Sequence, residues 1–296
     1  MEKPVSQVEL IDVGQDLLGE CPLWDVTTQS LYWIDSRRHL VHRWQPGSGA
    51  RADWTLLQEV GSIALCESGQ LLVAMVDEVL RLDPATGATT PLLRLQHAGD
   101  HMRLNDGRTD RAGRFVVGSL VKGRHELLGA LYQISGASLR EIDRGFCVSN
   151  TTCFSPDGRW MYFADSLTRH ILRYPYNTAT GEVGPREVFI DTAPLNSAPD
   201  GATVDAEGGL WVALVQTAQL ARFFADGRLD RLIDCPVPFV TCPCFGGESL
   251  DTIYLTSIRD SGNLLRTDHP QGGSLMAIRG TGVRGLPEVR FNDRGL

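Results

Sequence analysis

The sequence predicts an all-β fold, a six-bladed β-propeller with four antiparallel strands in each blade. Three observations support this prediction: a strand-rich segment recurs six times, a turn signal precedes each copy, and successive copies begin 40 to 49 residues apart. Repeats of this length that hold four strands are typical of propeller blades. The 31 glycines and 15 prolines are spread evenly over 296 residues. Because no change in composition marks a boundary, we expect residues 1–296 to form a single propeller domain.

The recurring segments supply the second strand of each expected blade. They are rich in β-branched and aromatic residues, as strands are, and they begin at Leu31, Leu71, Phe115, Met161, Leu210 and Ile253. Turn sequences come before them, such as Pro156-Asp-Gly158 and Glu207-Gly-Gly209. Third and fourth strands follow, as at residues 79–82 and 90–93. Residues 8–13 are left over, and we expect this strand to close the ring by pairing with the last blade.

Composition limits the classes of partner. A formal net charge of −8 argues against nucleic acid or an anionic membrane as a partner. The amino terminus lacks the basic start and apolar core of a signal peptide, and no apolar run approaches the ~18 residues of a membrane span. We therefore expect a cytoplasmic protein, either a monomer or a small homo-oligomer. The seven cysteines form no Cys-x-x-Cys pair, so we expect reduced, mostly buried thiols.

Oxygen-bearing side chains recur at one phase of the repeat. The innermost strand of a blade precedes the segments described above, and counting back 10 or 11 residues from a segment gives the start of that inner strand. In four blades this position holds Glu20, Asn105, Asn150 and Asp200. Because inner strands surround one channel, we expect these side chains to converge. Two carboxylates and two amides suit a hard divalent cation.

Turn formation is the simpler interpretation, since Asn-Asp-Gly and Pro-Asp-Gly are common turn sequences. Phase separates the two cases. Asp157 lies only 4 residues before its segment, which places it in a hairpin at the opposite face, whereas Asp200 lies 10 residues before. The seven histidines are scattered and form no ligand pattern. Cys242-Pro-Cys244 occupies the corresponding phase in the sixth blade, and we interpret it as reduced, channel-lining cysteines rather than a soft-metal site.

At these residues the sequence resembles the gluconolactonase/regucalcin (senescence marker protein) family of six-bladed propellers. The resemblance spans nearly the whole chain, and its most specific motifs are Leu18-Gly-Glu20-Cys-Pro-Leu-Trp24, Arg103-Leu-Asn105-Asp-Gly107, Ser149-Asn150 and Pro199-Asp200-Gly201. It implies that Glu20, Asn150 and Asp200 hold one divalent metal ion, which could be Ca, Zn, Mn, Mg or Fe(II). It also implies that Arg103 and Asn105 contact a small sugar lactone, which the enzyme hydrolyses to the open sugar acid. Leu104 stands where the family usually has proline.

A metal-assisted reaction agrees with what the sequence lacks, because there is no Gly-x-Ser-x-Gly nucleophile motif. We expect Asp200 to be the general base as well as a ligand. The loops that return to the channel mouth are basic, and Lys122 occupies a position where the family often has an acidic residue. We therefore expect Lys122 to bind substrate and to favour an aldaric or uronate-derived lactone, which carries a carboxylate, over a neutral aldonolactone.

Two other functions stay open on the sequence alone. One is a non-enzymatic calcium-binding or regulatory propeller. Arg103 argues against it, because a pure ion site has no use for a guanidinium beside the cation. The other is hydrolysis of aryl esters or organophosphates by a related type of propeller. That activity would need an apolar mouth, whereas the return loops contain many polar residues.

Overall fold

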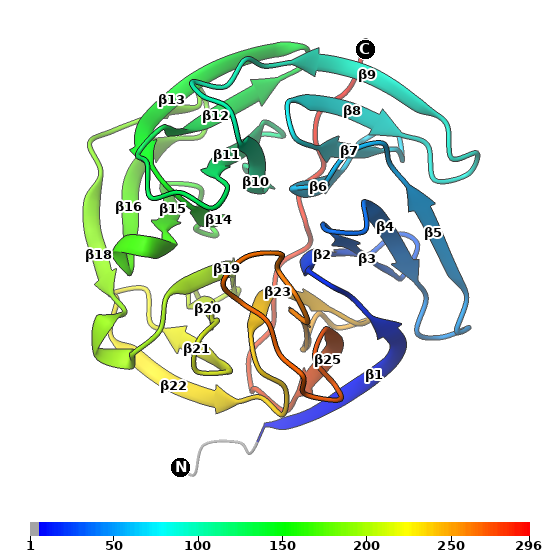
Figure 1. Ribbon diagram of the computed structural model, residues 1–296, viewed down its shortest axis with the longest axis vertical. Coiled ribbons are helices and arrows are strands. Elements are labelled where there is room, and N and C mark those ends of the chain that lie inside the picture. The colour runs from blue at the N-terminus through cyan, green and yellow to red at the C-terminus, as the bar shows by residue number, and fades with distance from the viewer. Residues whose placement is uncertain (1–5) are drawn as a thin grey trace.

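The computed structural model describes residues 6–296, which form six antiparallel sheets arranged as blades around a central channel (Figure 1). The predicted six-bladed propeller is confirmed. The first five residues of the expected domain 1–296 lie outside the described part of the chain. All six recurring segments form the second strand of a blade, as predicted.

From the channel outward, blade one contains β2 (Gly19–Asp25), β3 (Ser30–Asp35), β4 (Leu40–Trp44) and β5 (Arg51–Thr55). Blade two contains β6 (Ser62–Leu65), β7 (Leu71–Ala74), β8 (Glu78–Leu82) and β9 (Thr89–Arg94). Blade three contains β10 (Met102–Thr109), β11 (Phe115–Val121), β12 (Gly129–Ser135) and β13 (Ser138–Phe146). Blade four contains β14 (Ser149–Phe154), β15 (Trp160–Asp165), β16 (His170–Asn177) and β18 (Glu187–Asp191). Blade five contains β19 (Pro199–Val204), β20 (Leu210–Leu214), β21 (Gln219–Phe223) and β22 (Leu229–Asp234). Blade six contains β23 (Val240–Gly246), β24 (Thr252–Ser257) and β25 (Ser274–Arg279). A short strand, β17 (Glu182–Val183), pairs with the end of β16, and two 3₁₀ helices, η1 (Ser166–Thr168) and η2 (Ala193–Leu195), lie in loops.

The ring closes through the amino-terminal strand, as predicted. Strand β1 (Gln7–Gln15) pairs antiparallel with β25, so that Val8 lies opposite Ile278 and Leu10 opposite Met276. The sheet order β1-β25-β24-β23 makes β1 the outermost strand of the sixth blade (Figure 1). The first and last strands of the chain therefore share one blade, and the ring cannot open without breaking this pairing.

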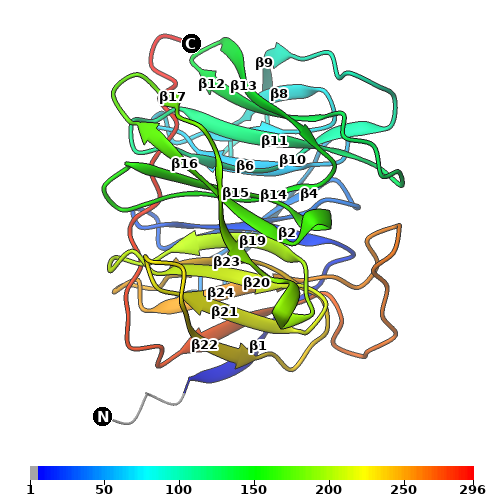
Figure 2. The same cartoon turned by 90° about the vertical axis from the view of Figure 1, so that its left-hand side faces the viewer.

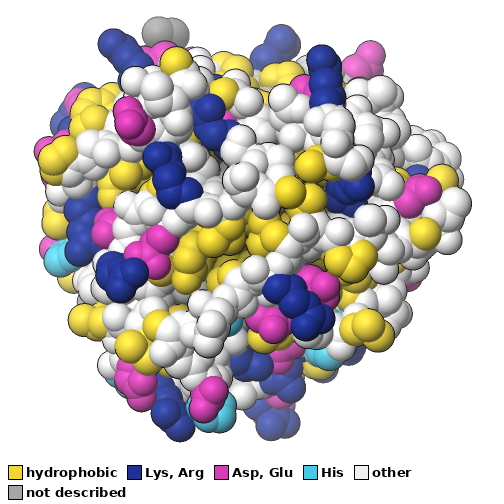
Figure 3. All heavy atoms as spheres, turned by 90° about the horizontal axis from the view of Figure 1, so that it is seen from above, with side chains coloured by type: hydrophobic (Ala, Val, Ile, Leu, Met, Phe, Trp, Pro, Cys, Tyr) yellow, Lys and Arg dark blue, Asp and Glu magenta, His cyan; other side chains and the backbone are white. Residues whose placement is uncertain are grey.

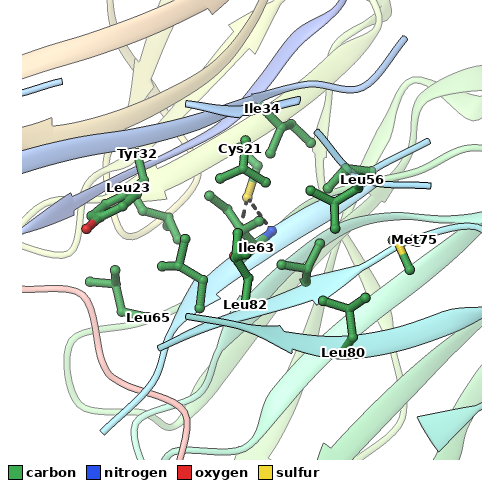
Figure 4. Close-up of a cluster of buried hydrophobic side chains, with 14 residues drawn as sticks. Cys21, Leu23, Tyr32, Ile34, Leu56, Ile63, Leu65, Met75, Leu80 and Leu82 are labelled. Carbon is green, nitrogen blue, oxygen red and sulfur yellow. Dashed lines mark hydrogen bonds between the residues drawn. The ribbon is translucent and has the colours of Figure 1, made fainter. Parts of the chain in front are cut away.

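Hydrophobic side chains fill the space between neighbouring blades. Between blades one and two, Leu23 and Ile34 pack with Ile63 and Leu80 in one buried cluster (Figure 4). Burial of one such side chain contributes about 1.5–3 kcal/mol. In the same cluster the Sγ atom of Cys21 accepts a hydrogen bond from the Ile63 amide (3.3 Å) and donates to the Ile63 carbonyl oxygen (3.5 Å). The inner strand of blade one is thus fixed to blade two at the residue after Glu20.

The edge of the ring carries charges of both signs (Figure 3). An exposed ion pair on the outer strand β13 joins Arg144 to Glu141 at 2.6 Å, and Arg94 of β9 lies 3.5 Å from the partly buried Glu78 of β8. Ion pairs that water screens contribute little to stability, so packing between blades rather than the edge stabilises the fold. Within residues 6–296 there is no helix of the length and apolar character needed to cross a membrane.

The inner strands all start at one end of the channel, which we call the mouth, and the segment after β25 lies across the other end, the far end. Residues 280–296 cross the middle of the ring in Figure 1 and run along one side in Figure 2, opposite η1 and η2. Phe291 of this tail is fully buried and pairs with Cys66 of blade two. Glu288 of the tail forms a 2.6 Å ion pair with Arg108 of β10. The tail therefore covers the far end of the channel.

Candidate metal and substrate site

The inner strands share an irregularity at the predicted phase. Strand pairing shifts at or directly after the phase position in five inner strands. The shifts lie between Glu20 and Leu23, Leu104 and Gly107, Asn150 and Cys153, Pro199 and Ala202, and Val240 and Pro243. Such bulges redirect side chains. In blade two, Ser62 of β6 occupies the equivalent paired position and donates a hydrogen bond to the Asn105 carbonyl (2.7 Å), and β6 pairs without a shift. The bulges therefore turn the phase residues into the channel.

Two buried aspartates hold the chain just before two of these bulges. The carboxylate of Asp35, at the end of β3, accepts hydrogen bonds from the amides of Leu17 (2.8 Å) and Leu18 (3.3 Å). In blade four, Asp165 accepts from the amides of Cys147 (2.8 Å) and Val148 (3.1 Å). These bonds explain why the recurring segments of both blades end in aspartate: the side chain fixes the approach to Glu20 and to Asn150.

Hydrogen bonds join the predicted substrate residues to a predicted metal ligand. Arg103 Nη1 donates to Asn105 Oδ1 (2.8 Å), and Asn105 Nδ2 donates to Asn150 Oδ1 (3.3 Å). The other end of the Asn150 amide is fixed, because its Nδ2 donates to Ser166 Oγ (2.8 Å), which donates to the Pro199 carbonyl (2.7 Å). Asn150 thus keeps its carbonyl oxygen on the side of Asn105 and the channel.

The two predicted carboxylate ligands lie close enough to influence each other. Burial raises the pKa of Glu20 well above its usual value, and the negative charge of Asp200 raises it further. Burial also raises the pKa of Asp200 well above its usual value, with a further contribution from Asp106. Glu20 keeps part of its surface open to the channel, whereas Asp200 is almost completely enclosed. Buried carboxylates without sufficient positive charge nearby are costly, and a bound cation relieves this cost.

The donor set fits a hard cation held by oxygen atoms. Nowhere in residues 6–296 do three or more His, Cys, Asp or Glu side chains form a group able to hold a metal. A cation at the mouth would therefore depend on the amide oxygen of Asn150 together with Glu20 and Asp200, which is the combination expected from the sequence. Carboxylate and amide oxygens are ligands for ions such as Ca²⁺ and Mg²⁺.

A close approach of two inner strands explains the glycine after Asp200. A Cβ atom at Gly201 would lie 2.4 Å from Cys242 Sγ and 2.9 Å from the Cys242 Cα. Only glycine therefore allows β19 to lie against β23 at this point. All seven cysteines are free thiols, as expected, and Cys242 is buried in this contact. Strand pairing places Thr241, not Cys242, level with Asn150. Thr241 is the residue after the Val240–Ser257 pair, and Asn150 is the residue after the equivalent Ser149–Asp165 pair.

Two acidic residues of the site escaped the sequence analysis. Asp106 follows Asn105 in the bulge of β10 and accepts a hydrogen bond from the Thr152 amide (2.6 Å). Burial raises its pKa, and its charge acts on both predicted carboxylate ligands. Glu59 lies in the connection between β5 and β6 and contacts Arg103 and Lys122. Asp106 could have been found as the second polar residue of its motif, whereas Glu59 belongs to no repeated position.

The mouth is less polar than the sequence suggested. The three most exposed large hydrophobic side chains of the described residues, Leu57, Leu264 and Leu127, have exposed fractions of 96%, 77% and 64% and all lie in mouth loops. Leu57 precedes β6, Leu127 lies between β11 and β12, and Leu264 lies between β24 and β25. The polar, oxygen-lined site is therefore entered between loops that also present leucines.

Comparison with known proteins places this geometry in a family. Residues 18–259 match the SMP-30/Gluconolactonase/LRE-like region. The chain belongs to this family. The matched residues include Glu20, Asn150 and Asp200, and extend from the first inner strand to the mouth loop of the sixth blade.

Relatives in the family include enzymes and calcium-associated proteins. The chain is 34% identical to 6-deoxy-6-sulfogluconolactonase from Pseudomonas putida over 93% of this chain and 95% of the relative. It is 30% identical to regucalcin from Gallus gallus over 97% of this chain and 99% of the relative. A crystal structure of a calcium-binding protein, regucalcin, from Agrobacterium tumefaciens superposes with a TM-score of 0.90 at 27% identity, covering 98% of this chain and 97% of that one.

Proposed function

We propose that the chain hydrolyses a sugar-acid lactone to the open sugar acid with the help of one divalent metal ion. Glu20, Asn150 and Asp200 would hold the ion. Arg103 and Asn105 would orient the substrate beside it. The family supports lactone hydrolysis, since one relative, aligned with this chain over 95% of the relative's length, is named 6-deoxy-6-sulfogluconolactonase.

One observation carries the proposal: hydrogen bonds from Arg103 to Asn105 and from Asn105 to Asn150 join the predicted substrate residues to a predicted ligand. The buried carboxylates of Glu20 and Asp200 support it, because burial and neighbouring negative charge raise the pKa of both. Two such carboxylates beside an oriented amide oxygen form a site with more negative charge than its neighbours neutralise. Arg103 is the nearby cation acting on both carboxylates. A divalent ion would supply the missing charge.

The residues of the chain would divide the reaction between them. When bound, the metal ion would polarise the lactone carbonyl and lower the pKa of water, which makes hydrolysis possible without a nucleophilic side chain. Asp200 would take the proton from the attacking water as the general base. Arg103, whose orientation is fixed by Asn105 and by the Leu104 carbonyl, would bind an oxygen of the sugar.

The preferred substrate would carry a second acidic group. Lys122 stands at the mouth with 45% of its side chain exposed, in the loop after β11. The named substrate of the Pseudomonas putida relative contains a sulfo group, which is an anion like the carboxylate of an aldaric or uronate-derived lactone. Both facts favour an acidic lactone over neutral gluconolactone.

A screen of lactones in a pH-stat tests the proposal. Protein stripped with a chelator should lose hydrolysis, and addition of Ca²⁺, Mg²⁺, Mn²⁺, Zn²⁺ or Fe²⁺ should restore it. Asp200→Asn should lower kcat by roughly a hundredfold or more, and calorimetry should show weaker binding of the restoring metal. Asp157→Asn is a matched control, because Asp157 lies in the hairpin between β14 and β15 at the opposite face.

The same experiment decides between the alternatives. Hydrolysis that survives metal removal would overturn the mechanism. Tight calcium binding without turnover of any lactone would instead support a calcium-binding or regulatory role. Aryl esters belong in the screen as well, because the exposed leucines of the mouth give an apolar group a surface to contact.

A further inference from the structure

Several positive charges surround Glu59 at the mouth. Lys122 Nζ lies 2.9 Å from both carboxylate oxygens of Glu59. Arg103 Nε approaches Glu59 Oε2 at 3.5 Å. Burial alone would raise the pKa of Glu59, but the Lys122 hydrogen bond and the charges of Arg103, Lys122 and Arg37 lower it. Glu59 is therefore ionised and faces three cations.

These cations come from different parts of the ring. Arg37 lies in the loop between β3 and β4, and its guanidinium lies against Gly262 in the loop of blade six, where a Cβ atom would be 1.2 Å from Arg37 Nη1. Arg103 begins β10 and Lys122 follows β11, so both belong to blade three. Glu59 joins them from the connection between blades one and two. We call Arg37, Glu59, Arg103 and Lys122 the Glu59 cluster.

The Glu59 cluster has capacity left for another anion. Counted on its own, the cluster of three cations and one carboxylate has a formal charge of +2. Arg103 also acts on Glu20 and Asp200, whose negative charge the proposed metal ion would offset. Arg103 Nη1 is used by the Leu104 carbonyl and by Asn105, and within residues 6–296 its Nη2 has no hydrogen-bond partner. The ammonium of Lys122 has three donors, of which Glu59 occupies two. Donors of both residues are thus available to a ligand that enters through the mouth.

We propose that the Glu59 cluster is the subsite for an anionic substituent of the lactone, with Glu59 as the counter-ion that holds Lys122 in place and limits the affinity for anions. This inference rests on the proposed lactone hydrolysis and deepens it by naming the group that distinguishes substrates. A carboxylate and a sulfonate share the required chemistry, a singly charged group with several acceptor oxygens. The chain of contacts Glu59, Arg103, Asn105 and Asn150 places this subsite next to the predicted metal ligands.

Glu59 acts on substrate only through its neighbours, so it is a positioning residue. Arg103 keeps two other hydrogen bonds when Glu59 is neutral, to the Leu104 carbonyl and to Asn105. Removal of the Glu59 charge therefore leaves Arg103 in place and raises the formal charge of the cluster from +2 to +3. Removal of the Lys122 charge has the opposite effect and lowers it to +1.

Three variants test the assignment: Glu59→Gln, Lys122→Met and the matched control Arg124→Met. Arg124 lies in the same loop as Lys122 and pairs with Glu126 rather than Glu59. For each metal-loaded protein, kcat/KM is measured on glucaro-lactone and 6-deoxy-6-sulfogluconolactone, which are anionic, and on neutral gluconolactone. The readout is the ratio of kcat/KM for an anionic lactone to kcat/KM for neutral gluconolactone, which we call the preference. Comparing the two anionic lactones shows whether a carboxylate or a sulfonate fits better.

The expected changes have opposite signs. Lys122→Met should lower the preference about tenfold, which corresponds to about 1.4 kcal/mol, and should weaken the dependence of kcat/KM on salt for anionic lactones. Glu59→Gln should raise the preference about threefold and strengthen the salt dependence. Arg124→Met should change the preference less than twofold. A purely structural role for Glu59 would alter both lactone classes equally.

Calorimetric titration with glucarate and gluconate, which differ by one carboxylate, gives a second readout without turnover. The tighter binding of glucarate should be lost in Lys122→Met. The inference is overturned if Lys122→Met leaves both the preference and this difference within twofold of the original protein, or if Glu59→Gln lowers the preference. A failure of the proposed function looks different: no lactone is hydrolysed at all, while the glucarate titration still reports on the subsite.

Discussion

The ion pair between Arg108 and Glu288 is the clearest place to test how the tail is attached. Arg108 lies on β10 beneath the site, and Glu288 belongs to the tail across the far end. Their side chains are 8% and 15% exposed, and Nη1 and Oε1 are 2.6 Å apart. Burial alone would lower the pKa of Arg108, but Glu288, the largest opposing contribution, together with Asp106 and other neighbouring groups outweighs it, and the pKa is raised. Arg108 therefore stays charged inside the protein.

Replacement of Glu288 by glutamine should leave that charge without its partner. Breaking a buried pair typically costs about 3–5 kcal/mol. Glutamine can still accept one hydrogen bond, and Arg108 keeps its 3.0 Å bond to the Ala202 carbonyl, so we expect the lower end of this range, about 3 kcal/mol. At roughly 2–4 °C per kcal/mol for a chain of this size, Tm should fall by about 6–12 °C.

Thermal unfolding followed by tryptophan fluorescence and circular dichroism measures this shift. A double-mutant cycle with Arg108→Met and Glu288→Gln should show that the two changes are not additive, with a coupling above about 1.5 kcal/mol. Asp226→Asn is the control, since the Asp226–Arg228 pair is exposed to solvent and its loss should hardly change Tm. A Tm loss below 2 °C for Glu288→Gln, or additive single effects, would refute this account of the tail.

Three further changes can be checked in the same assay. His42 is buried between Asp16 and Asp53. Burial would lower its pKa, but the hydrogen bonds and charges of these aspartates raise it above the value in the unfolded chain. The stabilisation by His42 should therefore be complete below about pH 6.5 and disappear as the pH rises through its pKa in the folded protein. The Tm gap between the original protein and His42→Asn should accordingly shrink from pH 5.5 to 8.5, and a constant gap would contradict this. Phe291→Ala should cost about 3–5 kcal/mol, because the side chain is fully buried under blade two, and a loss under 1 kcal/mol would show that the tail is only loosely attached. Gly201→Ala should cost about 1–3 kcal/mol through its clash with β23 and weaken metal binding, whereas Gly47→Ala, which meets no atom within 4 Å, should be nearly neutral; equal losses would contradict the proposed strand contact.

Much of the fold followed from the sequence because a propeller repeats its local pattern. The six segments that begin at Leu31 and end with the one at Ile253 fix the blade count, and the leftover strand at residues 8–13 fixes the closure that pairs Val8 with Ile278. The phase of Glu20, Asn150 and Asp200 could be counted because each sits at the start of an inner strand. Because inner strands surround one channel, the ring itself predicts that these three side chains converge.

The parts that could not be predicted depend on local departures from the repeat. The bulge in β10 turns two consecutive residues, Asn105 and Asp106, toward the site, whereas regular alternation would point them to opposite faces. Glu59 lies in a connection whose course depends on contacts with blade three. The exposure of Leu57 and Leu264 is likewise a tertiary property, since a leucine in a loop sequence gives no sign of whether a neighbouring loop covers it.

The position of residues 280–296 across the far end has a consequence for traffic through the ring. Because these residues lie across the far end, we expect the ring-opened acid to leave through the mouth, by which the next lactone also enters. Entry and exit then exclude each other, and we expect accumulated acid to inhibit competitively. If hydrolysis itself is fast, slow release of the acid from the cations at the mouth would limit kcat.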